Sequence, residues 1–352
     1  MPLIIIMSLL CALRTLILSF SLLVPHTHAT AVEMRSLGAS TPLSSKSKVC
    51  NVLDYGAKAD GKTDISSAVK STFSQCVSGN RATLYIPPGS YSLAAGVTLS
   101  GASGWALKLD GLDTLTADGS FGGNAFVIEK GNDIEVYSSN DLGAINGQGY
   151  LKRKSGGSQN ARLLLFITVT NLSVHNLILV DSPTFHLIFN GVSNLEACYI
   201  TIRGPNIGGT DGIDLICTDN CHLHDFEATN RDECVSVKTP SQNLLIEDAC
   251  CNHSGGMSIG SLTADATNPP EISNISTCNI YSYKSTQMLM IKTWPGATGA
   301  AGYVKDSVFE NSWSYDYTYG FDIDQCKPSI TTYNIVDDRF NKTHRLVQSP
   351  NP

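Results

Sequence analysis

The sequence predicts an all-β fold, a single-stranded right-handed parallel β-helix with a short cap helix at its N-terminal end. From about residue 163 one sequence pattern recurs: a polar residue, an asparagine and then a run in which apolar residues alternate with others. Each interval holds a second run rich in Ile, Val and Leu, and no helical periodicity interrupts them. The asparagines recur after 23, 26, 23 and 31 residues, at Asn171, Asn194, Asn220, Asn243 and Asn274.

These asparagines are expected to stack as a side-chain ladder inside one turn of each coil. A β-sandwich is the alternative, because it is also built from short strands. In that fold, most connections between strands would be hairpin turns with sequences such as Asn-Gly and Asp-Gly. Such turns do not dominate here, so we favour the solenoid.

Residues 1–31 form a long apolar stretch that ends in Ala29-Thr30-Ala31, a small-x-small cleavage pattern. The pattern predicts a secretory signal peptide, with a membrane anchor as the alternative. Its removal takes away Cys11 and leaves 11 − 1 = 10 cysteines, an even number that favours disulfides in an oxidising compartment. We expect a secreted, extracellular glycoprotein with sequons at Asn171, Asn252, Asn274 and Asn341.

Composition limits the partners of the chain. Charged residues are only 16%, and the formal net charge is −7, which argues against nucleic acid and against an anionic membrane. No other segment is apolar enough to span a membrane. An acidic polysaccharide remains compatible, because a local cationic subsite can work inside a negatively charged protein.

The N-terminal part is expected to close one end of the solenoid. Residues 32–47 are interpreted as an extension of the mature chain, and residues 51–76 read as a strand, a Gly-rich turn and an amphipathic helix. Residues 83–93, TLYIPPGSYSL, would be the first coil strand. A helix at this end would protect an open edge. Cys50 and Cys76 bracket the cap and are predicted to pair.

The stretch NRDECVSVK places Asp232 and Glu233 side by side at the start of an apolar run. Residues one repeat apart should lie one coil apart, roughly 4.8 Å along the axis. Asp211 precedes Asp232 by 21 residues, so the three carboxyls should converge on one face. Gly255 follows 23 residues after Asp232, and Lys292 comes later. Stacked acids with a cation nearby predict a site.

The ordered motifs TFHLIF, GGTDGID, NRDECVSVK, SGGMSIGSL and MIKTWPG resemble glycoside hydrolase family 28, pectin-cleaving enzymes with a pectin-lyase-like solenoid, over residues 48–325. Polygalacturonases of that family show NTD, DD, GHG and RIK at these points. This chain has Gly-Thr-Asp, Asp-Glu, Gly-Gly and Met-Ile-Lys, so the acids persist while the histidine and arginine that grip galacturonate are absent. These departures resemble the rhamnogalacturonan hydrolase branch.

The resemblance implies a secreted inverting glycosidase that cleaves the galacturonate–rhamnose α-linkage in rhamnogalacturonan I, within a catalytic domain at residues 48–335. Asp232 would be the general acid with a raised pKa, and Asp211 and Glu233 would hold and deprotonate the water. Lys292 would pair with a substrate carboxylate, and Gly255 would leave room for a sugar. We expect no metal and no cofactor, and we expect the protein to be a monomer.

The resemblance also implies a disulfide between Cys234 and Cys251. It leaves residues 336–352 as a tail that ends early for the family. The sequence leaves the partners of six cysteines open: Cys198, Cys217, Cys221, Cys250, Cys278 and Cys326.

Each site residue has a plainer reading when it is taken alone. Asp211 before Gly212 could be a turn residue, Asp232 and Glu233 a solvated corner, and Lys292 a surface charge. The joint pattern favours a site. Two other functions stay open: a polygalacturonase acting on homogalacturonan, endo or exo, and a non-catalytic β-helix that binds polysaccharide.

Overall fold

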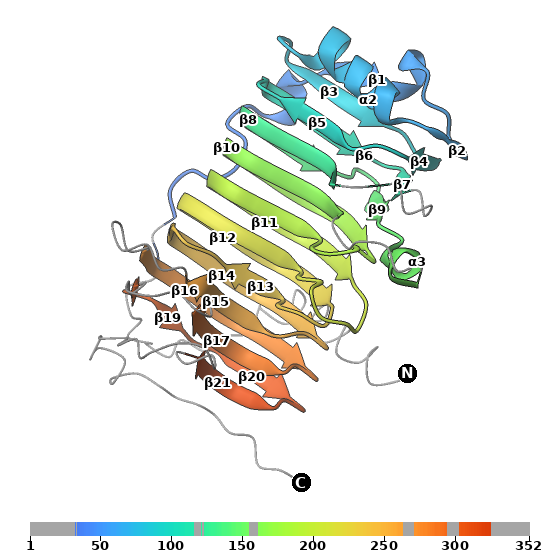
Figure 1. The fold of residues 1–352 in the computed structure, drawn as a ribbon. Coiled ribbons are helices and arrows are strands. Elements are labelled where there is room, and N and C mark those ends of the chain that lie inside the picture. Colours follow the sequence, from blue (N-terminus) through green and yellow to red (C-terminus); the bar gives the residue numbers. More distant parts are fainter. Residues whose placement is uncertain are drawn as a thin grey trace, which may run out of the picture. The chain divides into compact units, whose positions relative to one another are not determined.

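The described part of the chain is a stack of β-coils whose strand pairings are all parallel (Figure 1). In this computed structural model the described residues are 32, 34–115, 121, 123–154, 161–262, 271–293 and 303–324. The predicted signal peptide, the tail at 336–352, Cys326 and Asn341 lie outside them. Among the described residues, no helix has both the length and the apolar character needed to cross a membrane. The predicted parallel β-helix is confirmed.

The cap has the predicted order of strand, turn and helix. It comprises β1 (Lys48–Asn51), η2 (Val52–Tyr55), β2 (Asp60–Asp64), α2 (Ser66–Thr72) and η3 (Phe73–Val77). Cys50 and Cys76 are joined by a disulfide, as predicted. Phe73 meets Trp105 of the first coils edge-on, with ring centroids 5.1 Å apart, so the cap closes over the buried interior.

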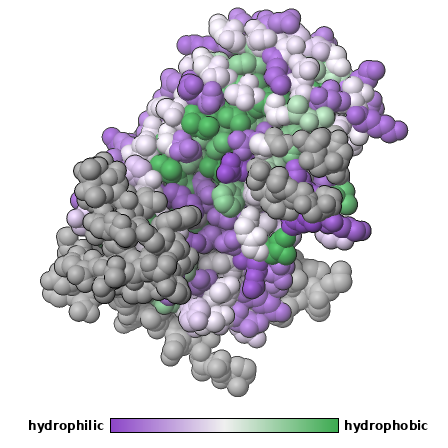
Figure 2. Space-filling view, viewed as in Figure 1, coloured by the Kyte–Doolittle hydropathy of each residue, from purple (hydrophilic) through white to green (hydrophobic). Residues whose placement is uncertain are grey.

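The coils follow one another without a change of direction. The remaining elements are η1 (Leu43–Ser45), β3 (Ala82–Ile86), β4 (Ser90–Leu93), β5 (Val97–Ser100), β6 (Ser103–Leu109), β7 (Leu112–Leu115), β8 (Asn124–Tyr137), β9 (Ala144–Asn146), α3 (Gly149–Lys154), β10 (Arg162–Val180), β11 (Leu187–Arg203), β12 (Ile213–Thr229), β13 (Val235–Val237), β14 (Ser241–Asn252), β15 (Met257–Leu262), β16 (Glu271–Tyr283), β17 (Gln287–Thr293), β18 (Tyr303–Lys305), β19 (Val308–Phe309), β20 (Ser312–Tyr315) and β21 (Tyr319–Asp324). On the face in Figure 2, hydrophilic side chains gather over the middle coils and hydrophobic ones nearer the cap.

The asparagine ladder is present, and it bends the long strands. All five residues have φ between 50° and 55°, the left-handed region that Asn tolerates better than most residues. The Asn194 amide donates to Asn171 at 2.9 Å, Asn220 to Asn194 at 2.8 Å and Asn274 to Asn243 at 2.7 Å. An amide can donate and accept at once, so the ladder propagates from coil to coil.

The ladder has one departure from the predicted column. Asn243 donates to Asp219 Oδ1 at 2.6 Å and not to Asn220. The Oδ1 atom of Asn220 instead accepts the Arg35 backbone N–H at 3.0 Å. The N-terminal extension has therefore taken the acceptor that the next asparagine would use.

The ladder also bears on the predicted glycosylation sites. Asn171 donates its Nδ2 to Asn132 Oδ1 at 2.8 Å, and Asn274 donates its Nδ2 to Asn243. A glycan would be attached to the same nitrogen, which would keep one N–H for the ladder bond, so both sequons stay predicted acceptors. Asn252 ends β14 with a partly exposed side chain and stays a predicted acceptor.

Residues 34–46, here called the N-terminal strap, lie along the edge of the coils (blue in Figure 1). Gly38 N–H donates to Asn194 O at 3.1 Å and Ala39 N–H to Ser173 Oγ at 2.9 Å. Thr41 N–H donates to Asp133 Oδ1 at 2.9 Å, and the buried Lys46 ammonium lies 3.4 Å from the same oxygen. The predicted extension thus ties several coils together, which its sequence did not indicate.

Gly38→Ala is expected to lower the free energy of unfolding by about 1–3 kcal/mol. Gly38 has φ +72°, and an added Cβ would lie 2.4 Å from Ser173 Oγ, which must then leave its bond to the strap. Urea denaturation measures the loss, and hydrogen exchange of residues 34–46 localises it.

Gly101→Ala is the matched control for this change. Its φ is +76°, and an added Cβ would meet nothing within 4 Å, so it reports backbone strain alone. Equal losses in the two variants would show that the strap contact contributes nothing.

Candidate active site

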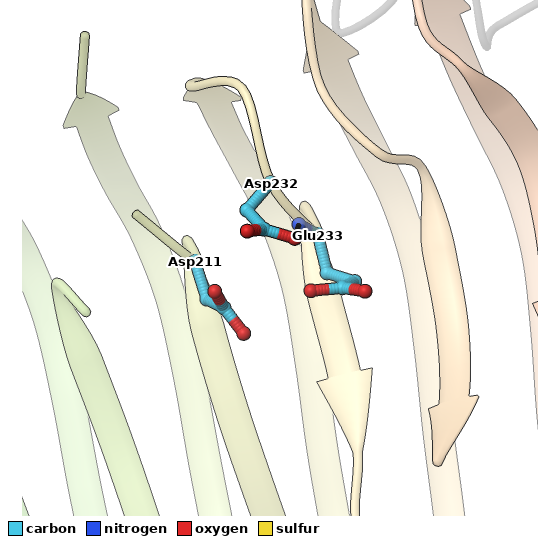
Figure 3. A group of neighbouring side chains, drawn as sticks. All are labelled: Asp211, Asp232 and Glu233. Atoms are coloured by element: carbon cyan, nitrogen blue, oxygen red, sulfur yellow. Dashed lines mark hydrogen bonds between the residues drawn. The ribbon is translucent and has the colours of Figure 1, made fainter. Parts of the chain in front are cut away.

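The structure brings Asp211, Asp232 and Glu233 together at the turns where two neighbouring coils begin (Figure 3). One carboxylate oxygen from each lies within 4.8 Å of the others. Asp211 precedes β12, and Asp232 and Glu233 lie between β12 and β13. Ile213 pairs with Val235, and Gly212 N–H donates to Glu233 O at 2.8 Å, so Asp211 lies opposite Glu233 on the next coil.

Asp232 is the half-buried member of the group, while Asp211 and Glu233 are buried. Its Oδ2 accepts the Gly209 backbone N–H from the loop of the preceding coil. Its Oδ1 accepts the Glu233 N–H at 3.2 Å. Asp232 is therefore the carboxyl that a polymer in solution reaches first.

A fourth carboxyl, Asp214, belongs to the group although the sequence analysis did not single it out. It is buried on β12 and shares a hydrogen bond with Asp211. The signal was available in GGTDGID, where the second Asp stands three residues after the first. Buried acids this close cannot all be ionised at low cost.

Burial, followed by the charges of Asp214 and Asp232, raises the pKa of Asp211 to about 8. Burial also raises the pKa of Asp214, but the nearby Lys238 and the hydrogen bond with Asp211 oppose that rise. Asp211 therefore carries the shared proton near neutral pH. The acid role expected of Asp232 stays a prediction, and the raised pKa of Asp211 is an additional feature of the site.

Lys292 lies against one of the acids. Its Nζ donates to Glu233 Oε1, and the two side chains are 14% and 8% exposed. This ammonium was expected to pair with a substrate carboxylate. In the structure it offsets the charge of Glu233, and a substrate would have to share it.

Two buried side chains hold the backbone beneath the acids. Asn230 Nδ2 donates to the carbonyls of Thr210 at 3.0 Å and of Asp232 and Glu233, both at 2.9 Å. Asn230 is the first residue of NRDECVSVK, where nothing in the sequence distinguishes it from an ordinary turn residue.

His186 supports the backbone of Asp211 in a similar way. Burial lowers its pKa to about 4, so the ring is neutral. Its Nδ1–H donates to Asp211 O at 2.9 Å, and its Nε2 accepts the Ser182 N–H at 3.2 Å. This is a hydrogen-bonding role within the core.

Gly255 packs against the backbone that carries the acids. Its N–H donates to Asp232 O at 2.7 Å, and an added Cβ would lie 3.2 Å from both Asp232 C and Glu233 N. The glycine thus permits two coils to approach closely beneath the acids. That Gly255 also leaves room for a sugar stays a prediction.

The implied disulfide Cys234–Cys251 is present and ties the residue after the acids to β14. Of the cysteines without an assigned partner, Cys217 and Cys221 are joined to each other. Cys198 and Cys278 are free thiols, so the even cysteine count did not mean complete pairing.

The three carboxyls are also spaced so that they could hold a cation, since carboxylate oxygens bind hard metal ions. Lys292 already supplies positive charge at Glu233. The expectation of no metal and no cofactor stays a prediction.

The chain is similar in sequence to known glycosyl hydrolases. A sequence model described as glycosyl hydrolases family 28 matches residues 76–335. A probable rhamnogalacturonase B of Aspergillus fumigatus is 45% identical over 317 residues, 90% of this chain and 58% of that protein. Rhamnogalacturonase A of Emericella nidulans is 44% identical over 299 residues, 84% of this chain and 56% of that protein. The chain thus spans somewhat more than half the length of these relatives.

Solved structures share the fold at lower identity. The endo-xylogalacturonan hydrolase of Aspergillus tubingensis superposes with a TM-score of 0.66 at 23% identity, covering 83% of this chain and 79% of that one. The polygalacturonase of Erwinia carotovora gives 0.60 at 16% identity, covering 90% of this chain and all of that one. At such identities the likeness concerns the fold alone.

Proposed function

The chain belongs to glycosyl hydrolases family 28, and from this membership we propose that it hydrolyses the galacturonate–rhamnose α-linkage in the rhamnogalacturonan I backbone of pectin. The observation that carries the proposal is the group of Asp211, Asp232 and Glu233 beside a lysine. The relatives named rhamnogalacturonase support the substrate class. We further propose a secreted monomer, in line with the disulfides.

Asp232 is assigned as the general acid, because it is the least buried of these three carboxyls. It would protonate the oxygen of the leaving rhamnose. Glu233, with Lys292 beside it, is the base that takes a proton from water. Asp211 keeps its own proton and holds that water through a hydrogen bond, since its pKa lies at about 8.

The spacing of the acids bears on the stereochemistry. Inverting enzymes usually separate acid and base by about 6.5–9.5 Å, which leaves room for water. The nearest oxygens here lie within 4.8 Å of one another. Inversion is proposed nevertheless, because two buried carboxyls, Asp211 and Glu233, can hold one water between them while Asp232 faces the polymer.

Deacetylated rhamnogalacturonan is expected to be cleaved to oligomers with rhamnose at the non-reducing end, and polygalacturonate to be a far poorer substrate. The chain has Gly255 and Met290 where polygalacturonases place His and Arg. Each missing charge-assisted contact costs about 1.5–3 kcal/mol, roughly 10–150-fold in rate. Reducing-end release from both polymers, at equal enzyme concentration, measures the preference.

Early NMR spectra of the same reaction should show the β-anomer of the new galacturonate reducing end. An initial α-anomer would overturn inversion, and comparable rates on polygalacturonate would favour a polygalacturonase. Binding of either polymer without any release would favour the non-catalytic β-helix.

A further inference from the structure

Lys238 closes the stretch NRDECVSVK and lies just after β13. Val235 and Val237 of this strand are buried in the core, so by strand alternation Ser236, itself buried, and Lys238 lie on the opposite face of the strand. Asp214 is the partner of Ser236 on the preceding coil. Lys238 therefore lies on the same strand face as Asp214, the buried acid beside Asp211.

The two lysines near the acids take different partners. Lys292 lies against Glu233, whereas Lys238 Nζ lies 3.5 Å from Asp214 Oδ1. The Lys238 side chain is 29% exposed, about twice the 14% of Lys292. Lys238 is thus the more accessible ammonium for an incoming anion.

The pair formed by Lys238 and Asp214 is loose. Its 3.5 Å separation exceeds the roughly 2.7–2.9 Å of a charge-assisted hydrogen bond. An ammonium has three donors, so the contact with Asp214 orients Lys238 and leaves donors for another acceptor. A carboxylate entering from solvent could use them.

The charges of the site leave two cations for a polyanionic substrate. Four carboxyls meet here, Asp211, Asp214, Asp232 and Glu233. Asp211 carries the shared proton, and Asp232 must be protonated to act as the general acid. Asp214 and Glu233 then carry two negative charges, matched by Lys238 and Lys292, so a polyanionic substrate gains attraction only where its own carboxylates meet these ammonium groups.

We propose that Lys238 binds the carboxylate of a second uronic acid in the substrate, separated by one neutral sugar from the uronic acid that Lys292 contacts. The inference rests on the proposed function, because an alternating chain carries a carboxylate on every second sugar. A chain lying across the acids then presents one carboxylate to each lysine. Lys238 is accordingly a specificity residue for alternating acidic polymers.

Binding to an inactive enzyme tests the assignment without relying on hydrolysis. In an Asp232→Asn background, alternating galacturonate–rhamnose oligomers are titrated calorimetrically with their carboxyls either free or methyl-esterified. Lys238→Met should weaken binding of the free acid by about 10–150-fold and leave that of the ester nearly unchanged. Lys238→Arg should retain most of the preference for the free acid.

The ratio of the two affinities is the deciding quantity, because partial unfolding lowers both affinities equally and cancels. Lys70 is an exposed lysine in the last turn of α2, in the cap. Lys70→Met removes the same charge at a position distant in sequence from Lys238, and it should leave the affinity ratio at the value of the Asp232→Asn protein. A ratio unchanged by Lys238→Met would overturn the inference and restrict Lys238 to neutralising Asp214.

The wild-type enzyme separates the two claims. Hydrolysis of rhamnogalacturonan together with an unchanged affinity ratio would sink the assignment of Lys238 alone. No hydrolysis, together with a ratio that depends on Lys238, would sink the proposed activity and keep the carboxylate subsite.

Discussion

Asp232→Asn should remove nearly all hydrolysis while the protein stays folded. General acid catalysis contributes roughly 10²–10⁴-fold, and an amide cannot supply the proton. The fold should tolerate the change because Asp232 is half-buried in a turn and its two hydrogen bonds come from the backbone N–H groups of Gly209 and Glu233. The Asn carbonyl can still accept one of them. Rates on rhamnogalacturonan oligomers and a thermal melt measure both parts.

Asp316→Asn is the control for this substitution. Asp316 is exposed in a corresponding turn of a later coil, and its φ of +58° suits Asn. It should keep full activity. A folded Asp232→Asn enzyme with more than about a tenth of wild-type activity would transfer the acid role to Asp211, the residue that the structure keeps protonated near neutral pH.

Asp113 should make the stability of the protein fall as the pH rises. It lies on β7, fully buried, between Tyr91 and Ile145 of the neighbouring coils. Neither of its carboxyl oxygens has a hydrogen-bond partner among the described residues. Burial raises the pKa of Asp113 from 3.8 to about 7, so the folded protein holds a proton that the unfolded chain releases.

The sign follows from linkage between protonation and folding. Below the unfolded pKa of 3.8 both states are protonated and the residue costs nothing electrostatically. As the pH rises towards 7 the folded state loses up to about 4 kcal/mol, since one pKa unit corresponds to about 1.4 kcal/mol. The loss is complete above the folded pKa.

Asp113→Asn cannot ionise and should abolish this loss. Its free energy of unfolding, relative to wild type, should rise by about 4 kcal/mol between pH 4 and pH 8 in urea denaturation. Taking the difference cancels the contributions of Asp211 and Asp214, which titrate in both proteins. Asp54→Asn, at an exposed carboxyl in the cap, should show no such rise. A difference that is flat with pH would mean that water or a local rearrangement solvates Asp113.

The fold could be predicted because the residues that cause it recur at regular intervals in the sequence. Asn171, Asn194 and Asn220 recur with the coil length, and a left-handed corner followed by alternating apolar residues admits few other structures. The same periodicity converted the separation of Asp211 and Asp232 into proximity. The cap and its disulfide followed from local signals on adjacent segments.

What the sequence could not decide were contacts between segments whose separation does not repeat. The strap meets residues as far as 185 positions away, and no period encodes that path. Asp214 and Asn230 looked like ordinary strand and turn residues until the register placed them beneath the acids.

The sequence by itself determined which residue types recur in each coil of the solenoid. Strand alternation decides whether a side chain faces the core, and the coil length decides in which coil it lies. Only the tertiary structure decided how charge is shared among them. The proton on Asp211, the contact of Lys292 with Glu233 and the reach of Lys238 to Asp214 depend on burial and on distances of a few ångströms. Electrostatic energies change steeply over such distances, whereas the pattern of residues that builds the coil does not.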